Sequence, residues 1–368
     1  MTQKRLNTRY IKVDPLKPDP GAMHAAGAIL AQGGLVAFPT ETVYGLGANA
    51  LNGKAVIRIF EAKERPSDNP MIVHVADLDQ VKDLVENLPA PAKALMHAFW
   101  PGPLTLVLPV GSAVPSEVTA GLPSVAIRMP GHAVALSLIR AAGAPVAAPS
   151  ANLSGRPSPT TAAHVLQDLN GRIDMILDGG PAGVGVESTV LDLTGPVPTI
   201  LRPGGVTLEA LRGILGEVLV EPAVLSTLPA ARPRSPGMKY THYAPRAPLL
   251  LVEGEPQASA SKIREIATEY RSKGKQVGIL TYSDSEDYTG SGQVVLAGQR
   301  NKPETVAAGL YAALRRFNDL QVDFILAEGL PESGVGLAVM NRLRRAAGGR
   351  ILHVVNQDNG CLNKKYDE

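Results

Sequence analysis

Short apolar runs alternate with segments of helical apolar spacing along the chain, and glycine or proline separates most of them. Runs of strand length fall at residues 35–38, 71–75, 104–108, 124–129, 145–148, 173–177, 188–193 and 199–202. Helical spacing falls at residues 23–31, 56–65, 78–88, 91–99, 133–142, 161–169 and 208–215. This pattern predicts an α/β fold for the first part of the chain.

The same alternation returns after a proline-rich interval. Residues 221–248 have neither helical nor strand spacing, so we predict a linker there. Beyond it, strands are expected at residues 249–252, 277–280, 294–296, 324–327 and 351–355, and helices at 262–272, 305–319 and 335–347. The 368 residues therefore divide into domains at 1–220 and 249–368, the second with a mostly parallel sheet covered by helices.

Composition narrows the class of protein. The 36 Lys and Arg residues against 34 Asp and Glu leave a net charge of +2, so any nucleic-acid surface must be a local patch. The single cysteine, Cys361, excludes a disulfide framework and a cysteine-paired zinc site, which favours a reducing cytosol. No apolar run approaches the roughly 20 residues that span a bilayer, and residues 1–14 lack the apolar core of a signal sequence. We expect a cytoplasmic protein with no membrane partner.

Three loops carry short polar side chains or glycines where strands end. Residues 146–159 carry four short polar side chains on a backbone that also contains Gly155 and three prolines. This layout is typical either of a ligand-binding loop or of an ordinary strand-to-helix connection with capping hydroxyls. Residues 39–47 follow a predicted strand, the place where open α/β sheets bind ligands. Residues 178–187 are rich in glycine and could wrap an anion, although they fit neither of the two familiar nucleotide fingerprints.

Several charged residues allow two interpretations each. Lys63 and Arg65 come at the end of a predicted helix, where cations either bind a ligand or complement the helix dipole in solvent. His74 in an apolar strand is either a core or edge residue or a ligand contact, and Arg128 is either an edge residue or a carboxylate binder. A basic group in the second domain either contacts tRNA or forms a solvated helix face; it comprises Arg342, Arg344, Arg345 and Arg350.

An ordered series of motifs runs through the first domain. It consists of Thr40-Glu-Thr-Val-Tyr-Gly-Leu-Gly47, Lys63-x-Arg65, Asn69-Pro-Met-x-x-His74, Trp100-Pro-Gly-Pro-Leu-Thr105, Ala126-Ile-Arg-Met-Pro130, Pro149-Ser-x-Asn-x-Ser-Gly155, Glu187-Ser-Thr-Val190 and Leu201-Arg-Pro-Gly204. In this order the series resembles the YrdC-like L-threonylcarbamoyladenylate synthase family over about residues 20–215. Residues 235–245 and the second domain resemble the long, two-domain form of that family.

The resemblance implies both a fold and a reaction. The fold is an N-terminal YrdC-like twisted mixed sheet with helices and a concave, positively charged face, followed by a smaller C-terminal Rossmann-like, mostly parallel α/β domain. The reaction converts L-threonine, bicarbonate and ATP to threonylcarbamoyl-AMP and pyrophosphate. The product would pass to a downstream tRNA threonylcarbamoyl-transfer complex, which modifies the adenosine beside the anticodon of tRNAs that read codons beginning with A. Binding of tRNA by this chain is a further expectation.

The resemblance also assigns roles to residues, which agree with the chemistry. Phosphate charge is the main obstacle to attack on ATP, and Lys63 and Arg65 would be the catalytic cations that neutralise it. Further ATP contacts would come from Arg65 itself, Asn69, Ser124, Ser150, Asn152, Ser158 and Arg202. Threonine would be held by Arg128 and Ser188 at its carboxylate and by Thr42 and His74 at its hydroxyl end.

The predicted linker, residues 221–248, would act as a lid that keeps water from the unstable carbamate and adenylate. Its candidates for closing over the nucleotide are Tyr240, His242 and Tyr243. Mg²⁺ is expected with ATP, and because no carboxylate pair marks protein ligands, ATP and water would hold it.

Two other functions compete with this one. Hydrogenase-maturation carbamoyltransferases contain a similar domain but also carry zinc-finger cysteines, and this chain has one cysteine. An RNA-binding module could use the basic concave face. That alternative leaves the residues expected to read threonine without a purpose.

Overall fold

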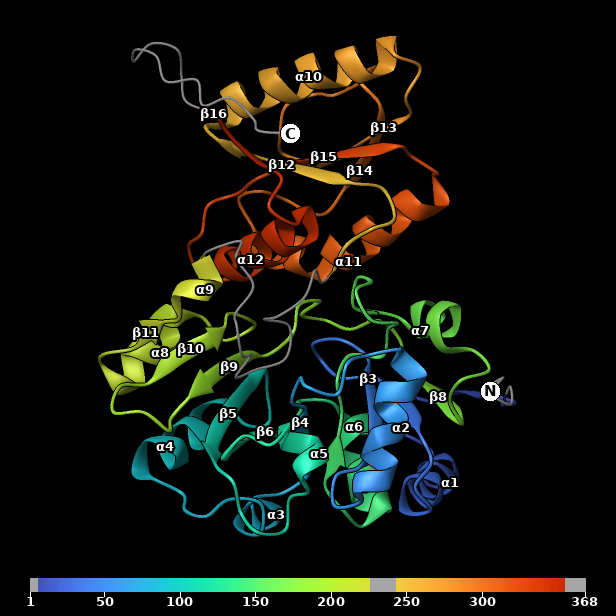
Figure 1. Cartoon of the computed structure of the whole chain (residues 1–368), viewed down its shortest axis with the longest axis vertical. Coiled ribbons are helices and arrows are strands. Elements are labelled where there is room, and N and C mark those ends of the chain that lie inside the picture. The colour runs from blue at the N-terminus through green and yellow to red at the C-terminus, as the bar shows by residue number, and fades with distance from the viewer. Residues whose placement is uncertain (1–5, 226–242, 355–368) are drawn as a thin grey trace.

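The computed structural model describes residues 6–225 and 243–354, which form two bodies joined end to end (Figure 1). Each body is built around its own sheet, of eleven strands in the first and five in the second. Within these residues no helix is both long and apolar enough to cross a membrane.

The first sheet is mixed, with the strand order β1-β8-β2-β3-β7-β4-β6-β5-β9-β10-β11. Its strands are β1 (Arg9–Lys12), β2 (Val36–Phe38), β3 (Gly45–Asn49), β4 (Ile72–His74), β5 (Leu104–Pro109), β6 (Ser124–Arg128), β7 (Val146–Ala147), β8 (Met175–Asp178), β9 (Thr189–Asp192), β10 (Thr199–Arg202) and β11 (Leu219–Val220). The sheet contains both parallel pairs, such as β4 with β6, and antiparallel pairs, such as β3 with β7. The expectation of a mixed α/β fold is confirmed.

Helices cover both faces of this sheet because its strands are apolar on both faces. Val36 and Phe38 belong to one cluster of buried side chains, whereas Ala37 between them packs in another with Ile59. The helices are α1 (Pro20–Ala31), α2 (Gly53–Lys63), α3 (Asp79–Lys82), α4 (Ala90–Phe99), α5 (Ser116–Thr119), α6 (Ala133–Ala142), α7 (Ala162–Leu169), α8 (Leu208–Leu215) and α9 (Pro222–Leu225).

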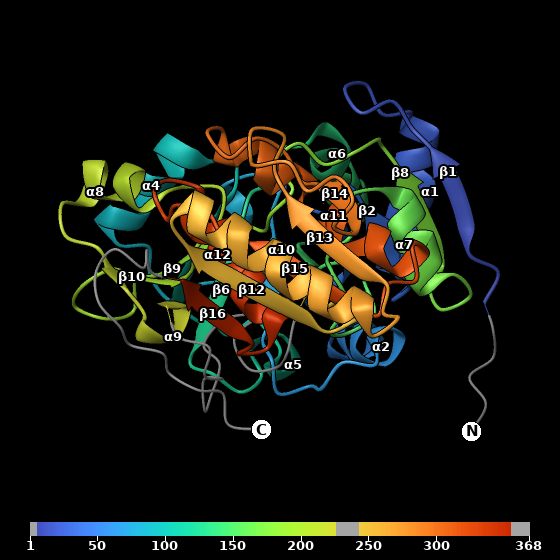
Figure 2. The same cartoon turned by 90° about the horizontal axis from the view of Figure 1, so that it is seen from above.

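The second sheet has the order β14-β13-β15-β12-β16 and is parallel throughout. Its strands are β12 (Leu249–Gly254), β13 (Val277–Thr281), β14 (Gln293–Leu296), β15 (Phe324–Glu328) and β16 (Ile351–Val354). Helix α10 (Pro256–Ser272) covers one face, while α11 (Pro303–Asp319) and α12 (Gly336–Ala347) cover the other (Figures 1 and 2). The α11–α12 layer is the one that meets the first domain.

Some local predictions were wrong. Strands β1 and β3 occupy segments predicted to be a polar lead and a loop, and the helix expected over residues 78–88 is reduced to α3. In β1, three of four residues are exposed at the sheet edge, so no apolar alternation marks the strand. In β3, a Cβ on Gly47 would lie 2.8 Å from Val146 and 2.9 Å from Phe38, which explains glycine in a packed strand. After α3, Val85 leaves helical geometry to form a β-bridge with Val110.

Candidate active site

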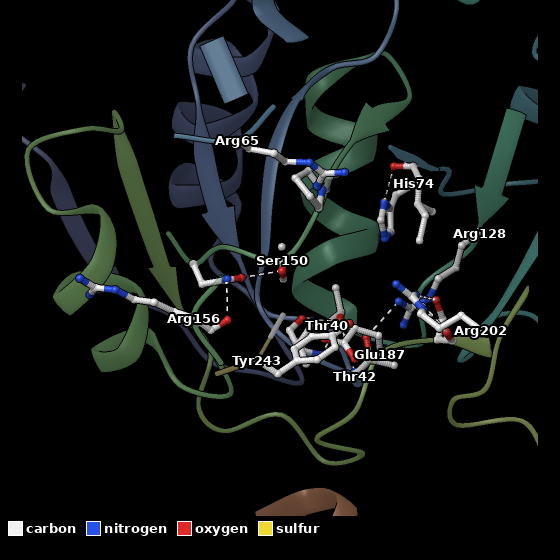
Figure 3. A pocket seen from close by; sticks show the side chains of 17 residues that line it. Thr40, Thr42, Arg65, His74, Arg128, Ser150, Arg156, Glu187, Arg202 and Tyr243 are labelled. Carbon is white, nitrogen blue, oxygen red and sulfur yellow. Dashed lines mark hydrogen bonds between the residues drawn. The ribbon is translucent and has the colours of Figure 1, made fainter. Parts of the chain in front are cut away.

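One pocket gathers residues from seven of the eight motifs at the ends of several strands of the first sheet (Figure 3). Its walls come from six segments that are spread between residues 40 and 202 and from one residue of the predicted lid. The lining consists of Thr40, Thr42, Val43, Gly45, Arg65, Ile72, His74, Arg128, Ala148, Pro149, Ser150, Asn152, Arg156, Glu187, Ser188, Arg202 and Tyr243.

Hydroxyl groups fix the turn between β2 and β3, which forms one wall. The Thr40 and Thr42 hydroxyls lie 2.8 Å apart, and Thr40 also donates to the carbonyl of Val43 at 2.6 Å. Both threonines are buried, so their hydroxyls are held in fixed directions. The turn therefore presents Thr42 to the neighbouring strands in one orientation.

Arg128 lies in the interior of the sheet, because β6 is flanked by β4 and β5. Its guanidinium donates to Thr42 Oγ1 at 2.9 Å and pairs with the carboxylate of Glu41 at 2.6 Å. The interpretation as an edge residue is thus wrong. The group binds a carboxylate of its own chain and still faces the pocket.

His74 is the register partner of Arg128 on β4 and faces the same pocket. Its Nδ1 lies 3.2 Å from the carbonyl oxygen of Ile72, and its ring makes an edge contact with Phe38. Burial, and then the charge of Arg128, lower the pKa of His74 to about 3. The imidazole is therefore neutral near pH 7 and can exchange hydrogen bonds with a hydroxyl.

A second arginine closes this end of the pocket. Arg202 donates to the carbonyl oxygen of Ser188 at 3.0 Å and to its hydroxyl at 3.1 Å. The Ser188 hydroxyl also lies 2.7 Å from that of Thr105. Arg128 and Arg202 are thus two buried cations, each hydrogen-bonded to a fixed hydroxyl, an arrangement that suits a carboxylate ligand.

The loop that follows β7 forms the opposite wall and is fastened from beneath by Lys63. The Lys63 ammonium donates to the carbonyls of Ser150 and Asn152, the latter at 2.5 Å. The Ser150 hydroxyl donates to Asn152 Oδ1 at 2.5 Å. Thr161, not these residues, caps the next helix, so the loop is more than a capped connection.

Lys63 and Arg65 do not form a solvated helix end, so that alternative is wrong. Lys63 is 2% exposed, and burial together with the charge of Arg65 lowers its pKa well below the ordinary value. Arg65 lines the pocket and donates to the carbonyls of Asn69 and Pro70, both at 3.0 Å. Burial lowers the pKa of Arg65 to about 10, which leaves it cationic at neutral pH.

The other residues predicted for the catalytic, ATP-binding or lid roles do not all reach the pocket. Of those within the described ranges, Lys63, Asn69, Ser124 and Ser158 do not line it. Ser158 is fully buried and donates to Glu187 at 2.5 Å, while Ser124 starts β6 opposite Pro109. Tyr240 and His242 fall outside the described residues. The roles expected for all six residues stay predictions.

Tyr243 is the described residue of the predicted lid that lines the pocket. Its ring centroid lies 5.3 Å from that of Tyr311, and the guanidinium of Arg342 lies 5.6 Å from it. Both partners belong to the second domain. The end of the linker is therefore held between the pocket and the α11–α12 layer.

The sequence interpretation missed several residues around the pocket. Glu187 had no assigned role, and Thr40 and Arg156 were not predicted to line it. The basic group of the second domain is for the most part not a solvated helix face: Arg342 is fully buried on Glu187, Arg344 pairs with Glu253 and Glu332, Arg345 is 6% exposed, and Arg350, which is exposed, donates to the carbonyl of Leu249. Contact of this group with tRNA stays a prediction. The burial of Arg342 could have been predicted from the sequence, because Arg342 follows the helical spacing of the apolar residues Val339 and Ala346, which are buried.

No group of three or more His, Cys, Asp or Glu side chains in residues 6–225 and 243–354 could hold a metal ion. The carboxylate in the pocket wall, Glu187, is already engaged by Tyr311 and Arg342.

Family models match both parts of the chain. The Sua5/YciO/YrdC model, described as telomere recombination, matches residues 28–204, and the model of the threonylcarbamoyl-AMP synthase C-terminal domain matches residues 206–348. The chain is similar to threonylcarbamoyl-AMP synthase of Bacillus subtilis, with 53% identity over 92% of this chain and 96% of that protein. It is also similar to threonylcarbamoyl-AMP synthase of Pyrococcus abyssi, with 50% identity over 89% and 95%.

A solved structure agrees with these matches. The crystal structure of Pyrococcus abyssi Sua5 complexed with L-threonine has a TM-score of 0.90 and 48% identity, and the match covers 95% of this chain and all of that one. Both domains are included in this coverage. The chain belongs to the family of two-domain threonylcarbamoyl-AMP synthases.

Proposed function

We propose that the pocket makes threonylcarbamoyl-AMP and pyrophosphate from L-threonine, bicarbonate and ATP. The observation that carries the proposal is that one pocket joins two groups of side chains. One group suits a small amino acid and contains Thr42, His74, Arg128 and Ser188, and the other suits phosphates and contains Arg65, Ser150 and Asn152. The names of the family members, and the threonine bound by the Pyrococcus abyssi protein, support the same substrates.

At the amino-acid end, Arg128 and Ser188 would hold the threonine carboxylate. Arg128 is fixed by Glu41 and Thr42 but still lines the pocket, and Arg202 adds a second cation next to Ser188. A neutral His74 and the Thr42 hydroxyl would contact the threonine hydroxyl. A buried polar site of this kind rejects analogues without the hydroxyl, because its own groups would be left unpaired.

At the nucleotide end, Arg65 and Ser150 face the pocket and Asn152 lines it with them. We propose that these residues bind ATP and that Lys63 supplies positive charge from just beneath the loop. Its hydrogen bonds to two loop carbonyls keep the loop in place in the structure described. Asn69, Ser124, Ser158, Tyr240 and Tyr243 are proposed as further ATP contacts in the substrate-bound protein.

The reaction requires a carbamate oxygen to attack the α-phosphorus while pyrophosphate departs. The carbon–nitrogen bond of the carbamate forms when the threonine amine captures bicarbonate, with loss of one water molecule. The carbamate oxygen then bonds to the α-phosphorus as the phosphorus–oxygen bond to the leaving pyrophosphate breaks. Arg65 and Arg202 are placed to offset the negative charge of the reacting groups. We propose that Mg²⁺ arrives with the triphosphate and keeps phosphate and water ligands, since the pocket offers no free carboxylate pair.

The product would be passed to a tRNA threonylcarbamoyl-transfer complex, and the cytoplasm is the compartment we expect. Direct tRNA binding by this chain is also proposed, although Arg342 and Arg344 of the second domain are engaged by carboxylates within the protein. The alternative of an RNA-binding module leaves the buried arrangement of Thr42, His74 and Arg128 unexplained.

Release of pyrophosphate from ATP tests the proposal. It should require both threonine and bicarbonate, with the adenylate detected by mass spectrometry, and valine, which lacks the hydroxyl, should replace threonine poorly. Release that is unchanged when threonine is omitted would disprove it. Binding of RNA with no adenylate formed under any condition would favour the RNA-binding alternative.

A further inference from the structure

Glu187 joins the active-site pocket to the second domain. It lines the pocket directly before Ser188, yet its carboxylate points to two residues of the other domain. Tyr311 of α11 donates to its two oxygens at 3.0 and 2.8 Å, and Arg342 of α12 pairs with it at 2.9 Å. Arg342 also donates to the carbonyl of Pro203 at 2.7 Å, next to Arg202. Tyr311 and Arg342, called here the first arm of the second domain, thus bind both segments that position Ser188 and Arg202.

The second arm is Arg315, which binds the loop of residues 150–158 that is proposed to hold ATP. Arg315 of α11 donates to the carbonyl of Pro157 at 2.5 Å and pairs with Asp168 at 2.8 Å. The Asp168 side chain is fully buried, and it also pairs with Arg156, which lines the pocket. Arg315 therefore fixes the far end of the loop that carries Ser150 and Asn152.

The two arms are connected within the first domain. Ser158 follows the residue held by Arg315, and its hydroxyl donates to Glu187 at 2.5 Å. Close packing leaves little freedom beside them: a Cβ on Gly185 would lie 2.3 Å from the Cα of Ala308 in α11. The charged groups are buried and matched across the boundary, so displacement of either domain would leave charges uncompensated.

We propose that Tyr311, Arg315 and Arg342 of the C-terminal domain are positioning residues for the reaction, which hold the two opposite walls of the active site at their working separation. The proposal rests on the proposed function. It assigns the second domain a share in catalysis through Glu187 and Asp168, without direct contact with substrate.

Two substitutions isolate the arms with little change in volume. Tyr311→Phe removes only the hydroxyl that binds Glu187 and keeps the ring beside Tyr243. Arg315→Met removes the bonds to Asp168 and Pro157. We expect Tyr311→Phe to raise the KM for threonine about tenfold and Arg315→Met to raise the KM for ATP by a similar factor, since each loses hydrogen bonds to a charged group. Loss of the alignment of the two walls should also lower kcat.

A third variant, Arg342→Met, adds a pH readout. The groups that face Glu187 are Arg342, Tyr311, Arg202, Tyr243 and Ser158. Burial opposes ionisation of Glu187, but the charges of Arg342 and Arg202 outweigh it and lower its pKa to about 2. Without Arg342 the carboxyl group should take up a proton at higher pH. A new acidic limb should then appear in the pH profile of kcat/KM.

Arg344→Met is the matched control. Arg344 lies on the same helix as Arg342 and also forms carboxylate pairs, but its partners Glu253 and Glu332 belong to the second domain. Its loss should leave both KM values and the pH profile unchanged. Comparable kinetic changes in the control would overturn the proposal, because they would reflect general loosening of the domain.

Amide hydrogen exchange on the full chain separates failure of this proposal from failure of the proposed function. Exchange should accelerate at residues 150–158 in Arg315→Met and at residues 187–190 in Tyr311→Phe, with no such change in Arg344→Met. These local changes are expected even if the natural substrates differ from those proposed. Wild-type kinetics and wild-type exchange in Tyr311→Phe and Arg315→Met would overturn the proposal, as would a lowered melting temperature with unchanged KM and kcat.

Discussion

The ammonium of Lys63, at the end of α2, lies 2.5 Å from the carbonyl oxygen of Asn152 in the loop after β7. A second hydrogen bond reaches the carbonyl of Ser150. Lys63, one of the two cations expected to act on ATP, therefore also fixes the loop that would hold the nucleotide. Lys63 and Arg65 then differ in what their removal should do.

Lys63→Met should lower both synthesis and stability. The variant keeps an apolar stem of similar length but leaves two carbonyls without their donor. We expect a loss of about 2 kcal/mol in the free energy of unfolding, measured by urea denaturation. A variant with wild-type stability would show that the loop does not depend on Lys63.

Arg65→Ala should remove activity with little change in the fold. Its guanidinium bonds to carbonyls of the adjacent turn, but it lies in the pocket wall and is partly exposed. Loss of a cation that stabilises phosphate charge should reduce kcat/KM about a hundredfold or more, while the circular dichroism spectrum stays native. Full activity would contradict a role for Arg65 in the reaction.

Arg128→Lys tests recognition of the threonine carboxylate. Lysine can still pair with Glu41, but it cannot offer two parallel donors, so the KM for threonine should rise about thirtyfold. The KM for ATP should change little. Arg140→Lys is a suitable control because Arg140 donates to the carbonyl of Ala76 and does not line the pocket. An equal rise in both KM values would indicate general damage to the pocket.

Tyr243→Ala should uncouple pyrophosphate release from recovery of the adenylate. The ring closes one side of the pocket, so its loss should admit water to the unstable intermediates. The ratio of intact adenylate to pyrophosphate, measured by mass spectrometry, should fall. Tyr270→Ala removes a ring stacked on Phe324 in the second domain and should leave the ratio unchanged. An unchanged ratio in Tyr243→Ala would show that this ring does not protect the intermediate.

The sequence predicted those features of the structure that leave a local pattern of apolar residues or an ordered series of motifs. Apolar runs revealed the two sheets, since buried strands need apolar residues whatever their partners are. They did not reveal β1, which is exposed, or β3, whose glycines give no apolar signal. The order of the motifs predicted that Arg65, Arg128 and Ser188 share a site, and the pocket brings them together. The partner of Arg342 was not predictable in this way, because Glu187 lies 155 residues away and only the folded chain brings the two together.

The pH dependence of stability should reveal the buried, neutral state of His74. Its pKa is about 3 in the folded protein, against an ordinary value of 6.5, so the unfolded chain takes up the proton first as pH falls. The folded state gains fully from the neutral imidazole above pH 6.5, and that gain is lost progressively as pH falls from 6.5 toward 3. Between pH 7 and pH 5 this residue should account for a loss of about 2 kcal/mol in the free energy of unfolding. His74→Gln, which keeps a donor for the carbonyl of Ile72, should lose correspondingly less stability over that range in urea denaturation. Equal losses in the two proteins would mean that His74 is protonated as readily in the folded state as in the unfolded chain.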